Sequence, residues 1–218
     1  MSHRGSRKNG SFSLRAWQLF VNDDRTYLAE AADRAIAQAP SFDITHLEFP
    51  NMALCLSNAF TTSPVPPCGN WVLCGLSFRE FPKLARHSVL HSQGAASSPD
   101  DRARDLAYTR ELFGKVKAAG LQVIAWHHLR RDLPDELATE YPESISGDAS
   151  FLRDWEEATL TEFFERVPEV DMLAVTSMTE TPGVLDLPSR ASQVDRLASV
   201  FGGMEQACRR AGKTLVIR

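Results

Sequence analysis

Val170-Asp-Met-Leu-Ala-Val-Thr-Ser-Met-Thr-Glu-Thr-Pro-Gly183 has the pattern of a β-strand that ends at a carboxylate. Its apolar run, Met172 to Val175, is typical of a parallel strand covered on both faces. Polarity rises towards Glu180, and Pro182-Gly183 then turns the chain. Ligands of parallel α/β folds bind beyond the carboxyl ends of the strands. Glu180 is therefore the first candidate site residue.

Length and composition indicate one globular domain. The chain has 218 residues, of which 43% are hydrophobic and 24% charged, enough to bury a single core. A formal net charge of -4 gives no electrostatic reason to expect nucleic acid or an anionic membrane as a partner. No apolar run approaches the roughly 20 residues of a membrane span, and the first residues lack a signal-peptide core. We therefore expect a cytoplasmic protein.

The cysteines predict reduced thiols. Their spacing matches neither a zinc motif nor a dense disulfide framework; they are Cys55, Cys68, Cys74 and Cys208. A metal site at the adjacent pair His127-His128 would need a third ligand, and neither a His-x-Glu nor a His-x-x-x-His pattern supplies one. We expect neither a metal nor a cofactor.

The domain organisation follows from local composition. Residues 1–13 are polar and rich in Gly, Ser, Arg and Lys, which predicts a flexible tail. Residues 14–218 form the domain, with a long irregular insertion at 51–98 that contains several prolines. Within it, Trp71 to Phe78 predicts a short extra strand or hairpin arm, and Phe81-Pro82-Lys83 leads into a short helix.

Strand and helix patterns alternate through the rest of the domain. Strands are expected at 14–21, 43–49, 121–126, 170–179 and 214–217, and helices at 27–39, 98–119, 151–166 and 189–211. Gly120 and Gly212 are placed to cap two of these helices. The polar segment 132–150 predicts a loop with one short helix. This alternation predicts a parallel sheet with right-handed crossovers.

The expected fold is α/β, an incomplete TIM (β/α)8 barrel with about five strands. The turn after the first strand, Val21-Asn22-Asp23-Asp24, lacks glycine, so a nucleotide-binding Rossmann fold loses its main support. Full barrels typically run to about 250 residues. We therefore expect a barrel fragment whose first and fifth strands are exposed edges, open to self-association or to a complementing segment.

At two strand ends the sequence resembles barrel glycoside hydrolases. Trp-Gln-Leu-Phe-Val-Asn-Asp at the first strand and Thr-Glu-Thr-Pro-Gly at the fourth resemble the amino-terminal half of α-glucuronidase-like barrels. The resemblance implies that Glu180 protonates the leaving sugar oxygen. Val-Ile-Ala-Trp-His, ending at His127, is similar to the Trp-His of family 10 xylanases, where the histidine lines a sugar subsite. Those xylanases carry Asn-Glu at strand four, whereas this chain has Thr179-Glu180, so a contact to the sugar 2-hydroxyl is in question.

Glycoside hydrolysis needs two carboxyl groups across the scissile bond. Glu180 is the candidate general acid, and the second carboxylate is either Glu48 or missing from this chain. Side chains alternate along a strand, so at most one of His127 and His128 faces the barrel axis. The expected substrate-binding residues near the strand ends are Asn22, Glu48, Trp126, His127, His128 and Arg130.

Individual roles remain open in the sequence. Arg130 and Arg131 suit a uronate carboxylate as a bidentate fork, or form a solvated pair. Trp126 either stacks on a sugar or fills the core, and Trp17 is better suited to the core. For Glu180, the alternative is a structural carboxylate that caps or salt-bridges a strand end.

The leading hypothesis is a glycoside hydrolase-like barrel that acts on a carbohydrate. The alternative is a non-catalytic sugar-binding or assembly half-barrel that lacks the chemistry. A barrel isomerase or aldolase of the Schiff-base type is disfavoured, because none of the expected strands ends in lysine.

Overall fold

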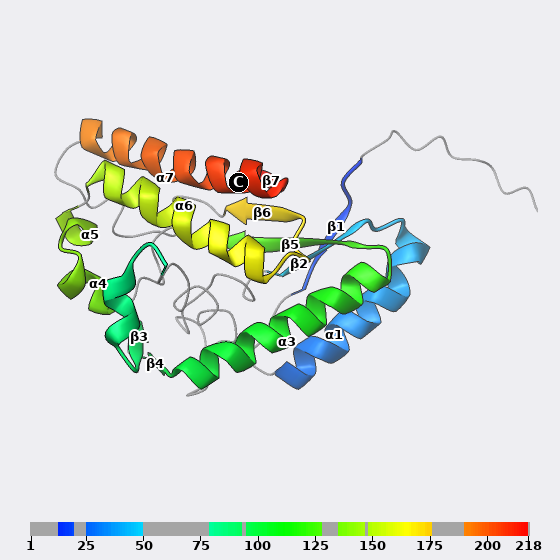
Figure 1. Ribbon diagram of the computed structural model, residues 1–218. Helices are drawn as coiled ribbons and strands as arrows, with labels where there is room; N and C mark the ends of the chain where they lie inside the picture. The colour runs from blue at the N-terminus through cyan, green and yellow to red at the C-terminus, as the bar shows by residue number, and fades with distance from the viewer. Residues whose placement is uncertain are drawn as a thin grey trace, which may run out of the picture.

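A computed structural model describes residues 13–19, 25–49, 79–92, 95–127, 135–146, 148–175 and 190–217. The chain enters the main sheet at β1 and leaves it at β7 (Figure 1). The strands of this sheet are β1 Ala16–Gln18, β2 His46–Phe49, β5 Gln122–His127, β6 Met172–Val175 and β7 Thr214–Ile217. The long helices are α1 Arg25–Gln38, α3 Pro99–Ala118, α6 Ala149–Arg166 and α7 Arg190–Ala211.

The main sheet is parallel, and its strands are ordered as in the sequence. In the described part of the chain it has five strands, in the order β1-β2-β5-β6-β7. Glu48 of β2 lies in register with Gln18 of β1 and Ile124 of β5. Trp126 of β5 lies in register with Ala174 of β6. All carboxyl ends therefore meet at one edge of the sheet.

The four long helices pack on one face of this sheet. Alternate strand residues contribute to the main core, including Leu47, Val123, Ala125 and Leu173. They share this core with buried side chains of all four helices, among them Ala35, Phe113, Phe163 and Met204. The strand residues in between, such as Glu48 and Ile124, are buried but lie outside that cluster. We call their side of the sheet the inner face.

Sequential strand order with every long helix on one face is the winding of a (β/α)8 barrel, whereas a doubly wound fold reverses its strand order. The chain thus has the architecture of a partial (β/α)8 barrel, as the alternation of strands and helices predicts. The five strands and four long helices all lie where the sequence predicts them, with shifts of at most three residues at the described boundaries.

The two connections beyond β2 and β5 contain further elements. The first holds the 3-10 helix η3 Pro82–Arg86, as expected, and an antiparallel hairpin of β3 Leu90–Ser92 and β4 Ala95–Ser97, which was not expected. The second holds two short helices, α4 Asp135–Glu140 and α5 Glu143–Ser146, rather than the one expected. The extra strand expected at Trp71 to Phe78 lies outside the described residues.

Two glycines end helices in the left-handed region, as predicted. Gly120 follows α3 with φ 77°, and Gly212 follows α7 with φ 66°. The Gly120 N–H donates to the Lys117 carbonyl at 2.9 Å. Only glycine adopts this backbone region without a steric cost, so both positions fix where the chain turns from a helix into the next strand.

A third glycine sets the approach of α7 to α6. A Cβ at Gly203 would lie 3.2 Å from the Glu157 backbone nitrogen and closer still to the Arg153 carbonyl oxygen. We expect Gly203→Ala to lower the free energy of unfolding by about 1–3 kcal/mol through overpacking. A Cβ at the neighbouring Gly202 would have nothing within 4 Å. Gly202→Ala should therefore raise the free energy of unfolding by about 1 kcal/mol, because alanine has the higher helix propensity. Urea unfolding of the pair tests this, and equal effects would contradict the close contact.

Two further observations bear on the sequence expectations. Cys208 is a buried free thiol, and burial raises its pKa to about 12, which disfavours the reactive thiolate. The other three cysteines lie outside the described residues. Within the described ranges, no helix is both long and apolar enough to cross a bilayer.

Candidate functional site

Glu48 and Trp126 meet on the inner face at the carboxyl edge of the sheet. Glu48 is the third residue of β2, and Trp126 is the fifth residue of the neighbouring strand β5. The Trp126 indole N–H donates to Glu48 Oε1. Glu48 is 3% exposed, whereas Trp126 is partly exposed. The structure thus brings together two of the residues that the sequence predicts for the site.

This pair combines an apolar aromatic surface with a fixed hydrogen-bond acceptor. A Trp ring presents a flat apolar surface, and its N–H fixes the ring when it is bonded. A carboxylate is an acceptor only, with about four lone-pair positions on its two oxygens. Aromatic walls with a few fixed polar groups are typical of sites that orient small ligands. An indole beside a carboxylate suits the apolar face and the hydroxyl groups of a pyranose.

His127 is not part of this arrangement. Its side chain points to the opposite face of β5 from Trp126, because side chains alternate along a strand. Its Nε2 lies 2.8 Å from Glu156 Oε2 of α6, and His127 and Glu156 are 5% and 3% exposed. The expectation that His127 binds substrate is therefore corrected: His127 is the histidine of the pair that packs against a helix. Its role is to tie β5 to α6.

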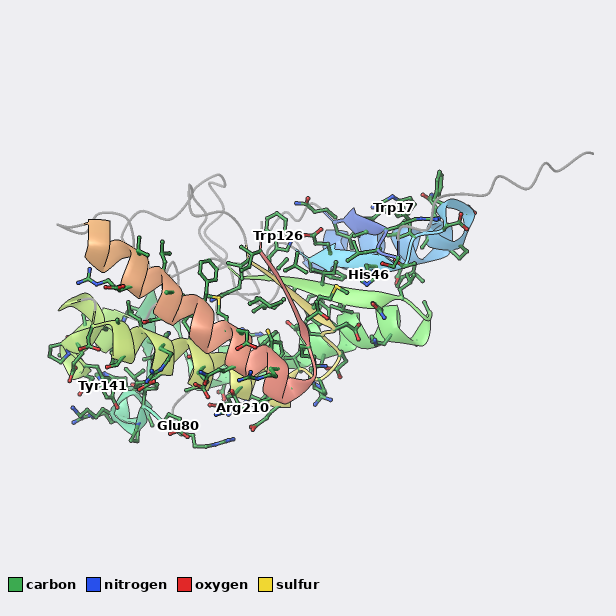
Figure 2. All side chains as sticks on the ribbon, turned by 90° about the horizontal axis from the view of Figure 1, so that it is seen from above. Trp17, His46, Glu80, Trp126, Tyr141 and Arg210 are labelled. Carbon is green, nitrogen blue, oxygen red and sulfur yellow. The ribbon has the colours of Figure 1, made fainter. Side chains whose placement is uncertain are left out.

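Trp17 also lies on the helix side of the sheet. It packs against the main core and against Phe42, with 5.2 Å between ring centroids. The core role favoured by the sequence is therefore correct for Trp17. Figure 2 shows Trp17, His46 and Trp126 in the same part of the molecule, away from Glu80 and Arg210.

The other predicted site residues lie outside the described residues. They are Asn22, His128, Arg130, Arg131 and Glu180, together with Thr179. Their roles stay predictions. All of these residues except Asn22 follow β5 or β6 in the sequence. β5 ends at His127, and β6, its neighbour in the sheet, ends at Val175.

Sequence reasoning missed a buried histidine on the inner face. His46 begins β2, two residues before Glu48, and is 3% exposed. Its Nδ1 lies 2.6 Å from the Thr45 hydroxyl, which itself donates to the Arg15 carbonyl at 3.2 Å. The His46 ring and the Thr45 hydroxyl therefore share a hydrogen bond. Burial lowers the pKa of His46 and the Gln122 side chain opposes this, so the ring is neutral at pH 7.

Only the burial pattern could have revealed His46, because a lone histidine at a strand start has no motif. It lies at the amino end of β2, at the opposite end of the sheet from the carboxyl edge. We assign it to the structure of the inner face rather than to the site.

Two cavities lined by described residues lie away from Glu48 and Trp126. One of about 510 Å³ lies against the outer side of α6, between Arg79, Phe81, Asp154 and Arg210. Another of about 480 Å³ lies at the β1 edge, between Trp17, Leu19, Arg34 and Gln38. Both cavities are lined by side chains of the helices, so neither is the inner-face site. Among the described residues, no group of three or more His, Cys, Asp or Glu side chains is placed to hold a metal ion.

Comparisons with known proteins identify no family. No protein-family model and no curated protein matches the sequence. Similar solved structures include a GH138 enzyme targeting pectin rhamnogalacturonan II, with a TM-score of 0.46 and 10% identity. A double mutant of the beta-glucosidase from Trichoderma harzianum and an alpha-amylase from Lactobacillus plantarum each have a TM-score of 0.47 and 12% identity.

The alignments cover 85%, 87% and 93% of this chain, but only 18%, 36% and 44% of the three enzymes. The chain therefore spans less than half the length of each. A likeness at this level assigns no substrate and no residue role. The fold assignment rests on the strand order and the helix placement.

Proposed function

We propose that this chain is a glycoside hydrolase-like half-barrel that binds a carbohydrate at the carboxyl edge of its inner face. The observation that carries the proposal is the pairing of Glu48 with Trp126 at that edge. The indole would stack on a sugar ring while the carboxylate accepts hydroxyl hydrogen bonds. Glu180, which follows β6 in the sequence, would be the general acid.

Glu48 is better suited to positioning the sugar than to direct chemistry. Strand β5 separates β2 from β6, so two strand spacings, about 9.6 Å, separate the strands that carry Glu48 and precede Glu180. A retaining enzyme requires carboxyl groups about 5–5.5 Å apart, and an inverting one about 6.5–9.5 Å. Together with the 3% exposure of Glu48, this strand spacing favours a positioning role over the role of second catalytic carboxylate.

A uronic acid is the proposed sugar class. The proposal rests on the resemblance of the Trp-Gln-Leu-Phe-Val-Asn-Asp and Thr-Glu-Thr-Pro-Gly segments to α-glucuronidase-like barrels. Arg130 would bind the uronate carboxylate, and Asn22 and His128 would contact hydroxyl groups. These three roles follow from the chain positions of the residues just beyond strands, where sites of this fold are built.

The second candidate is a non-catalytic sugar-binding module. One observation favours it: among the inner-face residues near the carboxyl ends of the described strands, Glu48 is the one carboxylate, beside Gln18, Trp126, Ala174 and Val216. Binding without hydrolysis would be the result expected of this module.

Calorimetric titration with glucuronic acid and xylo-oligosaccharides, with a hydrolysis assay beside it, tests the proposal. We expect Trp126→Ala to weaken sugar binding by about tenfold or more, because the variant loses the stacking surface and the N–H that orders the Glu48 carboxylate. Asp154→Asn, an exposed change on α6, is the control and should bind as the wild type does. Equal affinity of wild type and Trp126→Ala would contradict the proposed site.

A further inference from the structure

Two carboxylates of α4 hold the segment that contains η3 and β3. Glu136 and Glu140 lie four residues apart, on the same side of α4. Glu136 accepts from the His91 ring Nδ1 at 2.7 Å and from the His91 backbone N–H at 3.0 Å. Glu140 lies 2.8 Å from His87 Nε2 and 2.6 Å from the Arg86 guanidinium. Each glutamate thus pairs with one histidine.

An apolar cluster beneath these contacts keeps the two segments together. Phe81 before η3 packs on Trp155 of α6 and on Tyr141 after α4, with ring centroids 4.9 and 5.3 Å apart. Leu84 and Leu137 are buried in the same cluster. The polar contacts therefore lie at the rim of a small core, where both glutamates are largely buried, at 13% and 14% side-chain exposure.

The two segments belong to different connections of the barrel. The η3–β3 segment follows β2, which carries Glu48, and α4 follows β5, which carries Trp126. A contact between them links the connections beyond the two strands that form the candidate site. This link lies on the helix side, next to the start of α6 (Figure 1).

We propose that Glu136 and Glu140 form, with His91 and His87, a pH-sensitive clasp that joins the β2 and β5 connections. The clasp is tight at mildly acidic pH and loosens as the pH rises above neutrality. Histidine is the side chain whose charge ordinarily changes between about pH 5 and 8. Below that range each imidazolium faces a carboxylate, and above it the ion pair is reduced to a neutral hydrogen bond.

The charged groups around the clasp set its direction and its limits. Burial raises the pKa of Glu136, but hydrogen bonds from the His91 ring and backbone outweigh it and leave the pKa below its ordinary value. A carboxyl group whose pKa is lowered by folding stabilises the folded state at pH values above its ordinary pKa. This stabilisation is lost as the pH falls through the pKa of the folded state. The Glu136 carboxylate therefore stays ionised at mildly acidic pH and keeps its negative charge opposite His91.

The two arms of the clasp, the His91–Glu136 pair and the His87–Glu140 pair, should respond unequally to a change of pH. Glu140 also pairs with Arg86, and its carbonyl oxygen accepts from Lys83 Nζ at 3.0 Å. Arginine keeps its charge throughout this range, so the Glu140 arm retains a cation when His87 is neutral. Tyr141 also lies at this arm, where its hydroxyl accepts from the Lys83 backbone N–H. The His91–Glu136 arm carries most of the pH response.

Hydrogen exchange at the His91 amide tests the clasp, because this N–H donates directly to Glu136. After correction for the intrinsic exchange rate, we expect its protection factor at pH 5.5 to exceed that at pH 8 by about threefold or more. This factor corresponds to the stabilisation expected from a partly exposed ion pair. Glu136→Gln keeps the shape but removes the charge, and His91→Gln removes the titrating ring. Either variant should abolish the pH dependence.

Glu165→Gln is the matched control. It removes an exposed carboxylate of α6 that pairs with Arg79 at 3.0 Å, just before η3, and arginine does not titrate here. This variant should keep the pH dependence of the wild type. Protection of amides in α7 reports whether each variant is folded. Equal His91 protection at both pH values in the wild type, or a pH dependence that survives in folded Glu136→Gln or His91→Gln, would overturn the proposal.

Discussion

Replacing Glu180 by Gln should lower kcat on an unactivated glycoside by about 10²–10⁴-fold, the usual contribution of a general acid. Gln has nearly the same shape as Glu but has no proton to give to the leaving sugar oxygen. The measurement is steady-state hydrolysis of a xylo- or glucurono-oligosaccharide by wild type and variant. KM should change little, because the lost interaction acts in the transition state.

Two controls make this result specific. An aryl glycoside with a good leaving group needs little protonation, so Glu180→Gln should slow its hydrolysis much less. Glu48→Gln should instead raise KM, since Glu48 is assigned to sugar positioning. Unchanged turnover of the unactivated substrate in Glu180→Gln would contradict the general-acid role, and so would a wild type that binds the sugar without cleaving it.

Replacing His127 by Ala should lower the free energy of unfolding by about 3–5 kcal/mol, because it leaves the buried Glu156 carboxylate without its partner. The double variant His127→Leu, Glu156→Leu replaces both partners by apolar side chains and should unfold within about 1 kcal/mol of the wild type. Urea unfolding at pH 7 gives both values. If His127→Ala were as stable as the wild type but failed to bind sugar, His127 would belong to the site after all.

The fold could be predicted because local signals agreed with one another. The apolar run Met172 to Val175, the helix periodicities and the glycines at 120 and 212 each mark one element or boundary, and all of them fit a parallel alternating sheet. The β3–β4 hairpin was missed because Leu90–Ser92 and Ala95–Ser97 are too short and too weakly apolar to give a period. Long-range contacts attach this hairpin to the rest of the domain, above all the hydrogen bond between His91 and Glu136.

The position of the candidate site in the sheet could be predicted in part, for the same reason. Ligands of this fold bind at the carboxyl ends of the strands, so the sequence predicted Glu48 and Trp126 as members of one site. Which face each side chain occupies was not available from the sequence, because an apolar strand buried on both faces shows no alternation. That is why His127 was placed with the substrate. Its partner Glu156, in the middle of the 151–166 helix pattern, carries no local signal of burial.

The side-chain N–H resonance of Trp126 tests the central claim most directly, because this indole N–H donates to Glu48 at the proposed sugar site. In a two-dimensional NMR titration with glucuronic acid and xylo-oligosaccharides, we predict that the Trp126 indole resonance shifts in a saturable manner. The indoles of Trp17, on the helix side, and Trp155, in the second apolar cluster, should stay in place. A Trp126 resonance that does not move while sugar binds elsewhere, or no binding at all, would contradict the account.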